Sequence, residues 1–261
     1  MVASRPMHAE ASHSLLSVAI GGLPGQPRAV IDALAASGWR GVQLDARMAG
    51  MRPHELGESA RRDLMGLLSR RQLTLTGIDL WLPESAFSDP STQERAVDRT
   101  IDCIRLASAL GASSISTVLP EPGLHPDLQP AIDAVLVEAE SNGIRVADCS
   151  VGAHAAPTMR PYVHALCLDP ASLLTSGGDP IAAIHEWGDR LAAARLDDVS
   201  PNGLRIPPSI GGGGRLDLMA YKVAMSLATP DIGGGVVVDL RQCAQPLSAL
   251  QQARSAWESI S

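Results

Sequence analysis

Acidic side chains follow several short apolar runs of this 261-residue chain. Asp169 and Asp239 each end such a run, Asp148 lies at the end of another, and Arg195 and Asp198 stand at the end of a fourth. Carboxylates brought together repel one another unless a divalent cation or an arginine neutralises them, and oxygen ligands favour Mg²⁺ or Mn²⁺. The pattern predicts a weakly bound divalent metal or a metal-free cluster of Asp and Arg. The alternative for each aspartate is to cap a helix or a turn.

Other residues near these run ends are candidates for ligand binding. Trp81 could form an apolar wall for a sugar ring or could simply be packed, and His154 could reach the site from a loop. The glycine run at residues 211–214 could offer N–H groups to a phosphate, or could be a plain loop or a lid. Asp148 and Cys149 are adjacent in a strand, so only one of them can point into the site.

These residues need a scaffold that brings the ends of many apolar runs together. Short runs rich in Val, Ile and Leu alternate with longer segments of helical periodicity. The expected strands are residues 15–20, 41–45, 73–80, 114–119, 144–149, 165–169, 191–196 and 235–240. The expected helices are residues 27–37, 54–71, 88–111, 128–141, 179–190, 216–227 and 247–258, and the interval 149–165 leaves room only for a shortened or missing fifth helix.

Eight strands followed by helical crossovers predict an α/β fold, a single (β/α)8 TIM barrel, with its site at the carboxyl ends of the strands. An open, doubly wound sheet is the alternative, because alternation alone does not establish closure. The chain is expected to form one domain over residues 1–261, with residues 1–13 as a loose N-terminal segment.

Composition limits the possible partners. The net charge is −7, so the chain lacks the basic field that attracts nucleic acid or anionic membranes. Four cysteines without a CxxC pair suit a reducing compartment, and no segment is typical of a membrane span or a signal peptide. We expect a cytoplasmic protein whose partner is a small molecule. The oligomeric state does not follow from the sequence.

Several strings, in this order, resemble the xylose isomerase-like TIM barrels, a family that includes sugar and sugar-phosphate isomerases and epimerases. They are GWRGVQLD, IRLASALGASSI, AVLVEAESNGIRV, CLDPASLL, RLAAARLDDVSPNG and GGGRLDL. The resemblance implies a divalent metal held by Glu, Asp, His and Glu at the ends of strands five to eight, with the two glutamates moving a proton on the substrate.

Here the family ligand positions fall on Cys149 or Asp148, then on Asp169, Arg195 and Asp239. An arginine cannot ligate a cation, so Arg195 is expected to neutralise Asp169 and Asp239 where the metal would lie. Two hypotheses follow from the resemblance. One is a divergent isomerase or epimerase that binds a small polar or sugar-like ligand, with Asp169 and Asp239 as catalytic groups. Its ligand contacts would be Arg195, Trp81, His154 and Asp198. The other is a non-catalytic relative that binds a ligand or a partner, with an Arg-Asp cluster in place of the metal.

Overall fold

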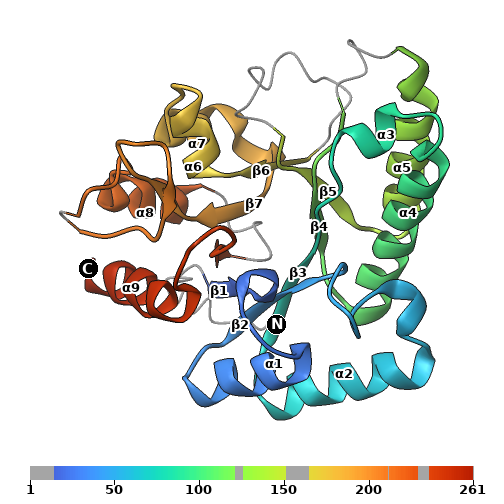
Figure 1. Ribbon diagram of the computed structural model, residues 1–261, viewed down its shortest axis with the longest axis horizontal. Coiled ribbons are helices and arrows are strands. Elements are labelled where there is room, and N and C mark those ends of the chain that lie inside the picture. The colour runs from blue at the N-terminus through green and yellow to red at the C-terminus, as the bar shows by residue number, and fades with distance from the viewer. Residues whose placement is uncertain (1–14, 121–125, 151–164, 211, 229–234, 261) are drawn as a thin grey trace, which may run out of the picture.

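Eight parallel strands form a closed barrel in the computed structural model, which describes residues 15–120, 126–150, 165–210, 212–228 and 235–260 (Figure 1). The strands are β1 (Leu16–Ala19), β2 (Gly41–Asp45), β3 (Thr74–Leu80), β4 (Ser114–Thr117), β5 (Arg145–Asp148), β6 (Ala165–Leu168), β7 (Leu191–Leu196) and β10 (Val236–Val238). Their order around the barrel is β1-β10-β7-β6-β5-β4-β3-β2. The closure confirms the predicted TIM barrel and rules out the open sheet.

Helices surround the strands. They are α1 (Pro27–Ala36), α2 (Glu58–Arg70), α3 (Ser85–Ser88), α4 (Gln93–Leu110), α5 (Gln129–Ser141), α6 (Pro170–Thr175), α7 (Pro180–Trp187), α8 (Leu218–Leu227) and α9 (Pro246–Ser259). Short 3-10 turns are η1 (Ile20–Gly22), η2 (Pro53–Glu55), η3 (Pro126–Leu128) and η5 (Gly188–Arg190). In Figure 1, α4 and α5 lie on one side of the barrel and α6 to α8 on the other.

Each helix buries one apolar face against the outside of the barrel. In α4, Cys103, Ile104 and Leu106 are buried, and the helix ends at Gly111, whose φ of 73° is the left-handed conformation that glycine adopts without a steric penalty. The predicted stop at Gly111 is therefore confirmed. No helix in the described part of the chain is long and apolar enough to span a membrane.

The inside of the barrel differs from its outside. One side of the lumen is lined by small residues, which are Ala147, Cys149, Ala165, Cys167, Ala192 and Ala193. The other side carries buried polar groups: Thr76 donates a hydrogen bond to Ser17 at 3.2 Å, and Gln43 donates one to Ser116 at 3.3 Å. Small side chains leave space at the centre, and the long side chain of Arg195, fully buried, occupies part of it.

Some element boundaries differ from the predicted ones. The long helix expected from residue 88 begins at Gln93, because the chain first makes the short α3 and a turn at Asp89. The helix α6 and the hairpin of β8 (Asp198–Val199) and β9 (Arg205–Ile206) were not anticipated. The predicted loose segment 1–13 and the interval of the fifth helix lie wholly or mostly outside the described residues.

Candidate functional site

Three of the predicted site residues follow neighbouring strands of the barrel. Asp169 follows β6, Arg195 is near the end of β7, and Asp239 follows β10, and all three side chains are buried. Burial lowers the pKa of Arg195, but the nearby carboxylates, Asp79 first and also Asp239, raise it above its ordinary value. The three residues therefore lie at the same end of the barrel, and Arg195 and Asp239 lie within electrostatic reach of each other.

Arg195 does not pair with Asp169 or Asp239, which corrects our expectation from the sequence. Its Nη2 lies 2.5 Å from Oδ1 of Asp79 on β3, across the lumen. The same Oδ1 accepts a hydrogen bond of 2.6 Å from Gln43. Asp79 is thus held by two donors from different strands, and the guanidinium is directed to the far side of the barrel.

Asp169 is neutralised instead by Arg205, a residue of β9. One Nη of Arg205 binds Oδ2 of Asp169 at 2.8 Å and also donates to the Ser172 hydroxyl at 3.2 Å, while the other binds Asp197. Burial, followed by the Asp169 charge, raises the pKa of Asp197 well above its usual range. Asp169 also caps α6 by accepting from the N–H of Ser172, so its position is fixed from two sides.

Asp239 is neutralised by Arg241, two residues later. Arg241 Nε donates to Oδ1 of Asp239 at 2.9 Å, and one Nη binds Oδ2. Burial alone would raise the pKa of Asp239, but the hydrogen bond and charge of Arg241 hold it well below its usual range. Arg241 also stacks on Trp81, with its guanidinium carbon 3.7 Å from the ring centroid.

Trp81 and Arg195 each carry one buried donor that has no partner among the described residues. These donors are the indole Nε1 of Trp81 and the guanidinium Nε of Arg195. The guanidinium carbon of Arg195 lies 5.5 Å from the Trp81 ring centroid. Because buried donors are normally satisfied, this pair marks a place where an oxygen acceptor from a ligand or water would be stabilised.

Two predicted site residues have structural contacts that account for them. The Oδ1 of Asp198 accepts hydrogen bonds from the N–H groups of Val199, Arg215 and Leu216, at 2.7, 2.9 and 2.9 Å. Asp148 points away from the lumen and accepts from the N–H of Leu119 at 3.1 Å. Both aspartates fix loops, which is the alternative that the sequence left open for each of them.

Cys149 takes the inward position that its neighbour Asp148 does not. Its thiol belongs to the small cluster that lines the lumen. Burial, and a hydrogen bond with Cys167, raise the pKa of the Cys149 thiol well above its ordinary value. A thiol that keeps its proton is a poor ligand for a hard cation.

The side chains present do not fit the divalent metal that the fold family implies. Among the described residues, no group of three or more His, Cys, Asp or Glu side chains is arranged to hold an ion. Asp169 forms an ion pair with Arg205, and Asp239 forms one with Arg241. By the resemblance to the family, Arg195 takes the position of a histidine ligand. His154, the remaining predicted contact, lies at residues 151–164, outside the described part of the chain.

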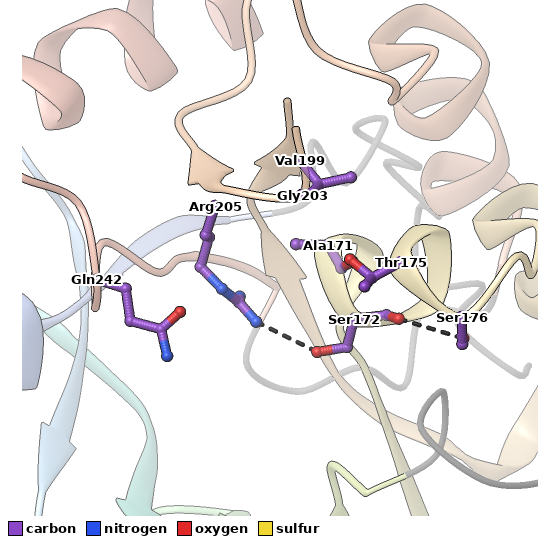
Figure 2. A pocket seen from close by; sticks show the side chains of 8 residues that line it. All are labelled: Ala171, Ser172, Thr175, Ser176, Val199, Gly203, Arg205 and Gln242. Carbon is purple, nitrogen blue, oxygen red and sulfur yellow. Dashed lines mark hydrogen bonds between the residues drawn. The ribbon is translucent and has the colours of Figure 1, made fainter. Parts of the chain in front are cut away.

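A hollow of about 410 Å³ lies at the same end of the barrel (Figure 2). We call it the mouth hollow. It is lined by Ala171, Ser172, Thr175, Ser176, Val199, Gly203, Arg205 and Gln242, which follow β6, β7 and β10. Figure 2 shows Arg205 reaching toward Ser172 on one side, with Gln242 on its other side. Arg205 and Ser172 therefore both bind Asp169 and line the mouth hollow.

The sequence did not identify the residues of the mouth hollow. Ser172 lies in α6 and Arg205 lies in the β8–β9 hairpin, neither of which periodicity predicts. Gln242 has a positive φ of 74° and its amide forms no hydrogen bond with a described residue. Only the charge of Arg205 could have indicated its role, since Asp169 and Asp197 require a nearby cation to offset their repulsion.

Comparison with known proteins bears on the family. A model of the xylose isomerase-like TIM barrel family matches residues 31–147. This segment is similar to that family. The match covers α1 to β5 and agrees with the resemblance seen in the sequence, while no curated protein matches the chain.

Solved structures of xylose isomerase-like barrels extend the similarity to the rest of the fold. A xylose isomerase domain protein from Planctomyces limnophilus is 15% identical, with a TM-score of 0.71, and 95% of this chain covers 97% of that one. D-psicose 3-epimerase, solved in the presence of D-fructose, is 12% identical with a TM-score of 0.70, over 94% and 97% of the two chains.

A third structure shows how far activities diverge on this fold. The probable 3-DHS dehydratase AsbF from Bacillus anthracis is 12% identical with a TM-score of 0.67, over 95% of this chain and 100% of that one. At these identities the similarity establishes a sugar isomerase- and epimerase-like barrel fold. The activity has to be argued from the site.

Proposed function

We propose that this chain binds a small polar ligand of the sugar type in the mouth hollow, without a divalent metal ion. The observation that carries the proposal is the position of Arg205. Its guanidinium contacts the carboxyl groups of Asp169 and Asp197 while it also forms a wall of the hollow. In relatives a metal ion would supply positive charge at this position. Here Arg205, which lines the mouth hollow, supplies it.

The lining of the hollow suits a hydroxyl-bearing ligand. The Ser172 hydroxyl accepts from Arg205 and can still donate, whereas Thr175 and Ser176 donate to helix carbonyls and keep only acceptor capacity. Gln242 offers a free amide with donor and acceptor atoms. Because two carboxylates pair with Arg205, the hollow has no large excess of either charge. A neutral ligand that both donates and accepts hydrogen bonds is therefore favoured over a strong anion.

A divergent isomerase or epimerase is the second candidate. The similarity of the fold to a sugar epimerase favours it. Against it, both carboxylates at the family's metal positions are bound to arginines, and proton transfer depends on a correctly placed free base. We propose that metal-dependent epimerisation is absent and that the barrel is a ligand-binding relative.

Calorimetry and a substrate screen test the proposal. The purified chain is titrated with MnCl₂ and MgCl₂, then with ketoses, aldoses and their phosphates, with and without metal. We expect no micromolar metal binding and saturable, metal-independent binding of at least one sugar. Ser172→Ala and Gln242→Ala should weaken that binding, whereas Ser226→Ala, an exposed serine of α8 outside the hollow, should leave it unchanged.

The same measurements decide between the two candidates. Micromolar Mn²⁺ affinity, together with turnover of a sugar that Asp239→Ala abolishes, would replace our proposal by the epimerase. Binding without conversion supports the ligand-binding relative. If no sugar in the panel binds, the assignment of the ligand class is wrong.

We also propose that the protein acts in the cytoplasm and that neither nucleic acid nor membrane is its partner. The support is the net charge of −7 and the free state of all four cysteines. Fractionation of the native cells, with antibody detection of the chain in the cytosolic or membrane fraction, tests the location.

A further inference from the structure

A second cavity, of about 540 Å³, lies beside the carboxyl ends of β2 and β3. We call it the arginine cavity. It shares no lining residue with the mouth hollow. Arg47 and Arg52 come from the segment between β2 and η2, and Arg99 comes from α4, so two regions distant in sequence contribute three guanidinium groups.

The charge of this cavity is opposite to that of the whole chain. The chain carries a net charge of −7, yet the cavity is lined by three arginines and His54 against one acid, Asp102. Guanidinium groups brought together in a concave wall repel one another, which an anion between them relieves. The excess of positive charge therefore favours an anionic ligand.

Most guanidinium donors in the arginine cavity are unused. The guanidinium of Arg99 forms no hydrogen bond or ion pair with any residue in the described ranges. Nη1 of Arg47 donates one hydrogen bond to the carbonyl of Trp81, at 2.6 Å. Arg52 donates to Glu55 and to the carbonyl of Arg47, at 3.1 and 3.3 Å. Since each guanidinium has five N–H donors, enough remain to bind a carboxylate or a phosphate.

Part of the remaining wall is apolar. Ala46, Leu80 and Leu82 line the cavity and are otherwise packed in the core. Their exposed fractions are 4%, 3% and 7%, so the apolar surface that faces the cavity is small, and the edge of a hydrocarbon or aromatic body would cover it. The volume lies within the range of about 300 to 1,000 Å³ that small-molecule sites have.

We propose that the arginine cavity binds an organic anion. Its carboxylate or phosphate group pairs with Arg47, Arg52 and Arg99, and its apolar body covers Ala46, Leu80 and Leu82. This site is independent of the sugar-type ligand proposed above, because the two cavities have different walls. Failure of either proposal leaves the other standing.

Isothermal titration of the full chain with four probes tests the chemistry. Phenyl phosphate and benzoate carry both an anion and an apolar ring, inorganic phosphate lacks the ring, and benzyl alcohol lacks the charge. We expect saturable binding of phenyl phosphate, benzoate or both, and the tighter of the two identifies the head group. Equal affinity for inorganic phosphate or for benzyl alcohol, or no binding of either aromatic anion, would overturn the proposal.

A matched pair of variants tests whether the anion binds in the arginine cavity. Arg99→Gln should weaken binding about tenfold or more, because a hydrogen bond to a charged group is lost. Arg95→Gln is the control, since Arg95 is exposed one turn earlier on α4 and lies outside the cavity. Asp102→Asn should strengthen binding by removing the opposing charge. An unchanged affinity in Arg99→Gln, or an equal loss in Arg95→Gln, would show that the anion binds elsewhere.

Discussion

Arg195 and Asp79 form an ion pair through the centre of the barrel, with 2.5 Å between Nη2 and Oδ1. Their strands, β7 and β3, are separated by three other strands along the sheet, so the contact must cross the lumen. Both side chains are almost completely buried. A TIM barrel lumen is usually filled by branched aliphatic side chains, and here a salt bridge takes that place.

This ion pair predicts strong coupling between the two residues. Arg195→Met leaves a buried carboxylate without its cation and should lower the free energy of unfolding by about 3–5 kcal/mol, as should Asp79→Leu. The double variant should lose much less than the sum, because neither charge is then left alone. Urea unfolding of the four proteins measures the coupling, and additive losses would contradict the buried pair.

Asp239 predicts a loss of stability in acid. Because Arg241 holds the pKa of Asp239 below its unfolded value of about 3.9, the ionised form stabilises the fold above that pH. This contribution falls as the pH drops below about 4 and the carboxylate is protonated. Asp239→Asn should therefore be less stable at pH 7 and should lose less on acidification. Urea midpoints at pH 7, 5 and 3 measure both effects.

Asp197 serves as the control, since its pKa is shifted in the opposite direction. Its pKa is raised by burial, so ionisation of Asp197 costs stability as the pH rises through the folded value. Relative to the native chain, Asp197→Asn should become more favourable at higher pH, whereas the deficit of Asp239→Asn should be largest there. Parallel pH profiles for the two variants would contradict the assignment of opposite shifts.

The close approach of Gly214 to Asp198 predicts that only glycine fits at position 214. A Cβ at Gly214 would overlap Oδ2 of Asp198, whereas a Cβ at Gly213 would meet no atom within 4 Å. Gly214→Ala should displace Asp198 from the N–H groups of Arg215 and Leu216 and lower stability by about 1–3 kcal/mol. Gly213→Ala should change it by less than about 1 kcal/mol. Thermal unfolding compares the two, and an equal loss would contradict this role for the glycine.

The sequence was sufficient to predict the barrel because strand and helix periodicity act locally. Each apolar run was visible, and Gly111 marked a helix end by its conformational freedom alone. The sequence also indicated that Asp169, Arg195 and Asp239 follow neighbouring strands. It could not assign partners, since the pairing of Arg195 with Asp79 depends on which side of the lumen has space, and small residues on β5 to β7 supply that space.

The residues of the mouth hollow could not be predicted for a related reason. Arg205 follows β7 in a hairpin whose two strands are only two residues long, too short for any period to be detected. Its role depends on the fold of that hairpin, which directs the guanidinium toward Asp169 and Asp197. The acids at strand ends were visible, but the cation that neutralises them was identified only in three dimensions.

Gln242 at the mouth and Gln72, just before the start of β3, provide a prediction about backbone strain. Both adopt a positive φ, 74° and 54°, which costs a residue with a Cβ roughly 1–2 kcal/mol relative to the right-handed region. Glycine tolerates this conformation but loses more backbone entropy on folding, so Gln72→Gly and Gln242→Gly should each stabilise the fold by about 0.5–1 kcal/mol. Urea unfolding measures both. A gain at Gln72 with a loss at Gln242 would mean that contacts of the Gln242 side chain hold the fold together, and would contradict the free amide proposed for the hollow.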